Sequence, residues 1–364
     1  MATTDPVRMT ETILIAGALG LVGRAVLGQL EAEGRTVIGL SRRAPDFPMQ
    51  TPFVSADLTD AADCRAKLAG ITGVTHLIYA ALYEKPDLRG GWLDTEQMAT
   101  NLAMLTNCMD ALEPGNPSLR HVSLLQGTKA YGAHLGQMPL PGKEDAPRHI
   151  HPNFYWAQED LIRARQQDKA WSWTIFRPQV VIGFALGSAM NLLAATGAYA
   201  AISRELGLPL VFPGAGDRIT EATDARLLAN AILWAGQAEQ AANQIFNVTN
   251  GDVLTWRSLW PVVARAFGME VGQPHPMSLP VVMSDKEPVW QRIVQRHGLL
   301  PHTLAELIGS SWQFADFAFS RTDQVASLVS TIKIRQAGFT DCIDSAAMLD
   351  WWLRELQRRR ILPP

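Results

Sequence analysis

Cysteine is scarce in this chain of 364 residues, and charge of neither sign is in excess. Cys64, Cys108 and Cys342 are scattered without a pairing pattern, so we expect reduced thiols, buried as small apolar side chains in a cytoplasmic protein. Residues 1–11 are polar and lack the apolar segment of a secretion signal. The formal charge of −3, from 32 Lys and Arg against 35 Asp and Glu, implies no attraction to nucleic acid or an anionic membrane.

Charged residues are also missing from residues 178–203, a stretch long enough to span a bilayer as a helix. Gln179, Asn191 and several serines and glycines interrupt its apolar character, and Arg177 stands just before it. We therefore expect a buried strand followed by a helix that lines a pocket, and no membrane span.

A lysine is absent where a short-chain dehydrogenase would carry the pattern Tyr-x-x-x-Lys. Tyr155 is followed four residues later by Glu159. A lysine at that place lowers the pKa of the tyrosine, whereas a carboxylate raises it. Either the site is inactive, or a lysine reaches Tyr155 from another part of the chain.

Short apolar runs alternate with helical patterns along the first two thirds of the chain, which predicts a parallel, doubly wound α/β sheet of the Rossmann type. We expect residues 10–180 to form the dinucleotide-binding domain, with a helix and strand returning to it around residues 218–250. Residues 181–217 and 251–364 are expected to form a smaller, mostly helical substrate-binding lobe. The expected strands are 13–16, 36–40, 53–58, 76–80, 121–125, 172–176 and 244–248, and the main expected helices are 24–33, 95–112, 155–167 and 224–238.

A glycine-rich turn follows the first expected strand. Gly17, Gly20 and Gly23 are spaced as Gly-x-x-Gly-x-x-Gly between a strand and a helix. Glycines there let the backbone approach a pyrophosphate, and the helix N-terminus supplies N–H donors and positive potential. The sequence therefore predicts a dinucleotide site.

The end of the second expected strand indicates which dinucleotide binds. No acidic residue stands there to bind the ribose hydroxyls of NAD, and Ser41 is followed by Arg42 and Arg43. Arginine at this place accommodates the 2′-phosphate of NADP, so we favour NADPH, although a solvated basic pair on a loop would look the same. Asp57 and Leu58 flank the adenine in this interpretation, or form an ordinary turn after a strand. The full set of expected cofactor contacts is Gly17, Leu19, Gly20, Leu21, Val22, Ser41, Arg42, Arg43, Asp57, Leu58, Ala80, Gln126, Pro178, Val180 and Val181.

Lys129 is a candidate for the missing positive charge. It lies in the loop after the fifth expected strand, where Gly127 takes the place of the usual catalytic hydroxyl. An ammonium close to a phenol lowers the pKa of the phenol and polarises its O–H bond. A loop lysine is more often merely solvated, and a tyrosine that opens a helix often only packs, so the hypothesis depends on the combination of Lys129, Tyr155 and the glycine turn.

At these motifs the chain resembles the progesterone 5β-reductase/iridoid synthase-like enone reductases, an atypical group of extended short-chain dehydrogenases. Trp156, Ala130 and Gln179 depart from the family pattern, and the loss of the second tyrosine at Trp156 supports Tyr155 as the catalytic one. The similar blocks are Gly127 to Tyr131 (Gly-x-Lys-x-Tyr), Asn153 to Asp160 (Asn-Phe-Tyr-Trp-Ala-Gln-Glu-Asp), Arg177-Pro178 with Ile182-Gly183-Phe184, residues 246–252 and residues 286–290.

The resemblance implies NADPH-dependent reduction of the C=C bond of an α,β-unsaturated carbonyl compound. Hydride is delivered to the β-carbon, Tyr155 donates a hydrogen bond to the carbonyl oxygen as negative charge develops, and Lys129 supports Tyr155. Such a reductase stabilises an oxyanion and needs no proton relay to oxygen, which explains the loss of the usual catalytic set. Glu159 is expected to favour the dipole of the helix from its first turn. The resemblance also implies a homodimer.

The substrate pocket should be apolar with few polar groups, suited to a small enone or enal. Its expected walls, each of which could equally belong to the core, are Tyr83, Trp92, Tyr131, Phe154, Met190 and Phe339. His149 and His151 lack a third ligand, so we expect no metal.

Two other functions stay open: an extended short-chain dehydrogenase or epimerase acting on a hydroxyl or a sugar nucleotide, and a regulator that binds NADPH without turnover.

Overall fold

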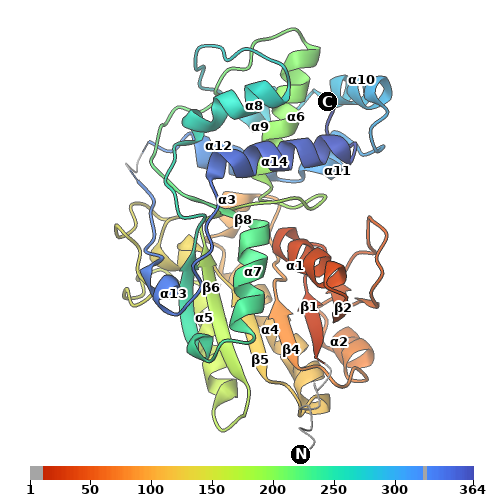
Figure 1. Ribbon diagram of the computed structural model, residues 1–364, viewed down its shortest axis with the longest axis vertical. Helices are drawn as coiled ribbons and strands as arrows, with labels where there is room; N and C mark the ends of the chain where they lie inside the picture. The colour runs from red at the N-terminus through yellow and green to blue at the C-terminus, as the bar shows by residue number, and fades with distance from the viewer. Residues whose placement is uncertain (1–10, 323–325) are drawn as a thin grey trace, which may run out of the picture.

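The lower part of the molecule in Figure 1 is built on a seven-stranded parallel sheet. The computed structural model describes residues 11–322 and 326–364. Along the sheet the strands are ordered β3 (Phe53–Ser55), β2 (Thr36–Ser41), β1 (Thr12–Ala16), β4 (His76–Tyr79), β5 (His121–Leu125), β6 (Ser172–Pro178) and β9 (Gln244–Val248). All neighbouring strands pair in parallel, so the predicted doubly wound sheet is confirmed.

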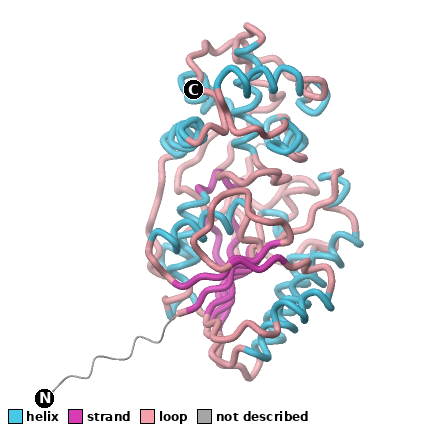
Figure 2. The backbone as a smooth tube through the Cα atoms, turned by 90° about the vertical axis from the view of Figure 1, so that its right-hand side faces the viewer, coloured by secondary structure: helices cyan, strands magenta, loops and turns pink. Residues whose placement is uncertain are grey.

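Helices cover both faces of this sheet (Figure 2). On one face lie α1 (Leu21–Ala32) and α7 (Ala225–Ala235), and on the other lie α2 (Ala61–Leu68), α4 (Thr95–Leu112) and α5 (Phe154–Gln166). Successive side chains of a strand point to opposite faces, and β1 follows this rule. Ile13 and Ile15 join the core beneath α1 and α7, whereas Leu14 and Ala16 join the core beneath α2 and α4.

A mostly helical lobe lies above the sheet in Figure 1 and has its own apolar core. The short parallel pair β7 (Val180–Ile182) and β8 (Ala222–Asp224) connects it to the sheet domain. α13 (Ile332–Gln336) instead packs beside β9. The other helices outside the sheet layers are α3 (Leu88–Gly91), α6 (Leu192–Glu205), α8 (Trp260–Ala266), α9 (Leu279–Val282), α10 (Glu287–His297), α11 (Leu304–Ile308), α12 (Ser311–Phe319) and α14 (Ser345–Arg358).

Several boundaries differ from the sequence prediction. α1 begins at Leu21, before the expected start at residue 24, because the glycine turn leads directly into the helix. The third strand ends at Ser55, and residues 56–58 form the loop after it. Cys64 and Cys108 are buried as expected, but the prediction is wrong for Cys342, which is exposed in the loop between α13 and α14.

The uncharged stretch of residues 178–203 forms β7 and most of α6. Nearly every residue of α6 is buried in the core of the lobe. The helix lines only a very small pocket there and not the main cavity, whose wall comes from residues 185–190 before it. In the described part of the chain, no helix combines the length and apolar character needed to cross a bilayer. Residues 1–10, on which the expectation about a secretion signal depends, lie outside the described residues.

Candidate active site

A cavity of about 600 Å³ opens at the carboxyl ends of the parallel strands and extends to the lobe. Its walls come from the loops after β1, β2, β3, β4, β5 and β6 and from the start of α5, together with residues 185–190 and Phe314 and Phe317 of α12. In open α/β sheets ligands bind at this edge, where the strand order reverses, here between β1 and β4. Every residue proposed from the sequence as a cofactor contact, from Gly17 to Val181, lines this one cavity.

The glycine turn fits a dinucleotide. Gly17 has φ +85°, and a Cβ added to it would lie 2.6 Å from the backbone nitrogen of Ala81, so only glycine is tolerated there. Gly20 precedes α1, and no side chain caps the helix. The first turn of α1 also carries no acidic residue, which leaves N–H donors and positive potential for an anion.

Arg42 and Arg43 follow β2 at the wall of the cavity. Arg43 donates a hydrogen bond from Nη2 to the carbonyl oxygen of Leu186, 3.1 Å away. The basic pair therefore lies where the second strand of a Rossmann domain meets the ribose of the adenosine half.

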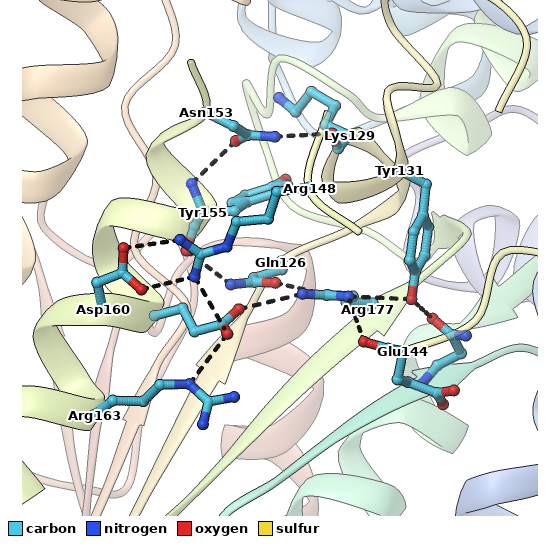
Figure 3. A network of polar contacts seen from close by, with 12 residues as sticks. Gln126, Lys129, Tyr131, Glu144, Arg148, Asn153, Tyr155, Asp160, Arg163 and Arg177 are labelled. Atoms are coloured by element: carbon cyan, nitrogen blue, oxygen red, sulfur yellow. Dashed lines mark hydrogen bonds and ion pairs between the residues drawn. The ribbon is translucent and has the colours of Figure 1, made fainter. Parts of the chain in front are cut away.

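Lys129 and Tyr155 lie together, although they come from different elements (Figure 3). Lys129 belongs to the 3₁₀ turn Thr128–Tyr131 after β5, and Tyr155 is buried in the first turn of α5. Lys129 Nζ is 5.6 Å from the centroid of the Tyr155 ring. The lysine absent from the Tyr155 helix is thus supplied by the loop after β5.

Asn153 connects this pair. Its Oδ1 accepts a hydrogen bond from Tyr155 N at 3.0 Å and caps α5, while its Nδ2 donates to the carbonyl oxygen of Lys129 at 2.8 Å (Figure 3). One side chain therefore fixes the start of the helix relative to the turn that carries the lysine.

Burial raises the pKa of Tyr155 above its ordinary value, and the carboxylate of Glu84 adds to this rise. Lys129 acts in the opposite direction, as the sequence predicted, but burial outweighs it. At neutral pH the tyrosine is consequently a protonated phenol that can donate a hydrogen bond.

Gly127 occupies the place of the usual catalytic hydroxyl. A Cβ added to Gly127 would be 3.5 Å from Tyr155 Oη and 3.5 Å from the carbonyl oxygen of Pro178. A serine or threonine there would lie beside the phenol, as in a carbonyl reductase. In this chain position 127 has no side chain, and Gly127 lines the cavity there.

The prediction that Glu159 serves the helix dipole is wrong. α5 begins at Phe154, so Glu159 lies beyond its first turn, and its side chain is buried against the guanidinium of Arg177 at 3.2 Å. Arg177 also donates from Nε to Gln126 Oε1 at 2.8 Å, and Gln126 Nε2 donates to the carbonyl oxygen of Tyr155 at 2.9 Å (Figure 3). Glu159 thus begins a polar network that ends on the backbone of Tyr155.

Four of the expected pocket walls line the cavity: Tyr83, Trp92, Phe154 and Met190. The prediction is wrong for Tyr131 and Phe339. Tyr131 donates a hydrogen bond to Asn247 Oδ1 at 2.6 Å and packs in a separate small core, because its ring turns away from the loop face that carries Lys129. Phe339 is buried in the core that the sheet forms with α1 and α7, and its ring centroid is 5.6 Å from that of Trp234.

Two ionisable residues of the cavity wall were missed from the sequence, Glu84 and His134. Glu84 is followed by Lys85, a pair typical of a solvated loop, and only its position shortly after β4 could have drawn attention to it. Burial and the charge of Lys129 lower the pKa of His134 to about 3, so its ring is neutral. Within the described ranges, no three His, Cys, Asp or Glu side chains lie together in a way that could hold a metal ion.

The parallel sheet, the glycine turn before α1 and the tyrosine at the start of α5 define the class of extended short-chain dehydrogenases/reductases. Solved structures show the same fold. The UDP-glucose 4-epimerase of Thermus thermophilus, in complex with NAD, is similar with a TM-score of 0.64 at 17% identity, covering 95% of this chain and 99% of its own. The UDP-glucose 4-epimerase of Thermotoga maritima is similar with a TM-score of 0.66 at 13% identity, over 95% and 99% of the two chains.

Within that class the chain belongs to the family of the PRISE-like Rossmann-fold domain, which matches residues 54–346. An (S)-8-oxocitronellyl enol synthase of Camptotheca acuminata is 33% identical, over 96% of this chain and 93% of that protein. A 3-oxo-Δ(4,5)-steroid 5β-reductase of Arabidopsis thaliana is 31% identical, over 99% of this chain and 95% of that protein. The resemblance found in the sequence motifs is thereby confirmed.

Proposed function

We propose that this protein is an NADPH-dependent reductase of the C=C bond of α,β-unsaturated carbonyl compounds. The observation that carries the proposal is the protonated, buried phenol of Tyr155 with Lys129 beside it, in the cavity that also contains the glycine turn. The names of the relatives agree with it, since a steroid 5β-reductase acts on a conjugated 3-oxo steroid.

Bound NADPH would supply a hydride to the β-carbon of the substrate. The glycine turn and the N-terminus of α1 would hold its pyrophosphate, and Arg42 and Arg43 its 2′-phosphate. Tyr155 Oη donates a hydrogen bond to the carbonyl oxygen, where negative charge develops as the enolate forms. The Lys129 ammonium stabilises that charge through Tyr155, and water then protonates the α-carbon.

The walls around this pair suit a small apolar substrate. Trp92, Phe154, Met190, Phe314 and Phe317 give the cavity an apolar surface, and its polar side chains include Lys129, Tyr155 and Glu84. A homodimer and a cytoplasmic location stay predictions of the sequence.

We expect the double variant Arg42→Ala/Arg43→Ala to bind NADPH about 10- to 100-fold more weakly, since each hydrogen bond to a charged group contributes about 1.5–3 kcal/mol. NADH affinity should change little, because NADH lacks the 2′-phosphate. Fluorescence titration with both cofactors measures the ratio. Arg257→Ala, an exposed arginine outside the cavity, is the matched control, and an unchanged NADPH affinity in the double variant would contradict the NADPH assignment.

The proposed activity is tested by following NADPH oxidation with a panel of cyclic enones, enals and steroid enones. We expect consumption of NADPH with at least one conjugated carbonyl compound and none with its saturated analogue. Tight NADPH binding without consumption would favour the regulator instead. Turnover of sugar nucleotides alone would favour the epimerase.

A further inference from the structure

A buried carboxylate lies against Lys129. Glu84 follows β4 on the cavity wall, and its side chain is only 5% exposed. Its Oε1 is 3.4 Å from Lys129 Nζ, and its Oε2 accepts a hydrogen bond from Gln97 Nε2 at 2.6 Å. Gln97 is itself fixed, because its Oε1 accepts from the backbone nitrogen of Lys85 at 2.8 Å. The carboxylate is therefore held from both sides.

Glu84 is paired with Lys129 at the cavity wall and not with the neighbouring surface lysine, Lys85. A buried carboxylate is costly unless a positive charge and hydrogen bonds compensate it. The neighbouring Lys85 turns outward to Asp94 and Glu96, so the ion pair that the structure gives Glu84 is with Lys129.

Aromatic rings complete the enclosure of the ammonium. Lys129 Nζ lies 4.8 Å from the ring centroid of Trp92 and 5.7 Å from that of Phe154. These rings attract the cation but do not set its position, whereas the carboxylate of Glu84 provides a directional partner. The side chain of Lys129 is thus held on the Tyr155 side of the cavity.

We infer that Glu84 is a positioning residue, which holds the Lys129 ammonium beside Tyr155 and offsets part of its charge. The inference rests on the proposed function, in which Tyr155 must be a neutral hydrogen-bond donor. Without the offset, Lys129 would lower the pKa of Tyr155 further, and the phenolate that then forms at a less alkaline pH cannot donate to a developing oxyanion.

Two charged side chains act on the pKa of Tyr155, and Glu84 is the negative one. Lys129 lowers the pKa of Tyr155 from the turn after β5, and Glu84 raises it from the loop after β4. His134 and His149, on the loops next to that turn, both have a lowered pKa, mainly through burial. From α4 the facing groups are the neutral Gln97 and Met98.

The test is Glu84→Gln, which keeps the size of the side chain and an oxygen for Gln97, removes the charge, and replaces the oxygen that faces Lys129 with an amide NH2. We expect the alkaline limb of kcat/KM for an enone to move to lower pH by roughly one to two units, the size of one unit charge lost at this range. We expect kcat to fall about tenfold with the Kd of NADPH unchanged. Glu84→Asp, which keeps the charge, should restore the pH profile in part. Glu96→Gln, an exposed carboxylate of α4, is the matched control and should keep the wild-type profile.

A second readout needs no turnover. The ultraviolet absorption of tyrosinate, followed with pH and compared with the same protein carrying Tyr155→Phe, isolates the ionisation of Tyr155. We expect this ionisation to occur at lower pH in Glu84→Gln than in the wild type. An unchanged Tyr155 titration overturns the inference, whether or not the protein reduces enones. A wild type that consumes no NADPH with any enone overturns the proposed function and leaves the titration to decide the role of Glu84.

Discussion

Tyr155→Phe is expected to lower kcat for enone reduction by about 10²- to 10³-fold, the usual cost of removing one oxyanion donor. The ring packs among Met98, Ala130 and Phe154, and phenylalanine keeps that packing, so folding should be preserved. Because the phenol would act on the substrate oxygen and not on the cofactor, the Kd of NADPH should stay within about twofold. Steady-state kinetics and cofactor titration measure the two quantities.

Lys129→Met is the companion to that variant, because it keeps the length of the side chain and removes the charge. Its loss of turnover should be smaller, about tenfold or more, since the lysine acts through the tyrosine. Tyr199→Phe removes a phenol that bonds the carbonyl oxygen of Val211 in the lobe, and should leave kcat near the wild type. Wild-type turnover in both Tyr155→Phe and Lys129→Met would contradict the catalytic assignment.

The largest loss of stability is expected from Arg177→Met. Arg177 is 5% exposed and Glu159 is 6% exposed, so the substitution leaves a buried carboxylate without its closest buried partner. Breaking such a pair costs about 3–5 kcal/mol of unfolding free energy. We expect the lower end, because Arg148 and Arg163 also approach Glu159, at 3.4 Å and 3.1 Å. Urea denaturation measures the change.

Two comparisons test the reason for that loss. The double variant Arg177→Met/Glu159→Gln should regain part of the stability, because the carboxylate is then neutral. Arg163→Met removes a side chain that is 48% exposed and should cost less than about 1 kcal/mol. If Arg177→Met lowers the unfolding free energy as little as Arg163→Met does, the buried network contributes little to stability.

The elements with strong local signals could be predicted from the sequence. β5 and β9 match the expected strands at both ends, and α4 matches the expected helix at both ends. Asp94 explains the start of α4, because its carboxylate accepts hydrogen bonds from Glu96 N and Gln97 N. The expected third strand was too long: the pairing of β3 with β2 ends at Ser55, and the chain turns at residues 58 and 59.

The position of the expected cofactor residues on one cavity could also be predicted, because parallel strands bring their carboxyl ends to one edge. The substrate wall could be predicted only in part, since an aromatic residue such as Tyr131 or Phe339 does not reveal which side of its backbone meets the cavity. Glu84 was missed for a similar reason: its contact with Lys129 joins residues 45 positions apart. Glu159 was misread because its partner Arg177 lies on another element.

The most direct test of the proposed reaction is the position of deuterium transferred from NADPH labelled at the transferred hydrogen. We expect the product of a conjugated enone to carry deuterium on the carbon β to the carbonyl, with the C=O bond retained and the C=C bond lost. An allylic alcohol with deuterium on the carbinol carbon would instead show carbonyl reduction and contradict the assignment of Tyr155 and Lys129 to an enolate oxygen.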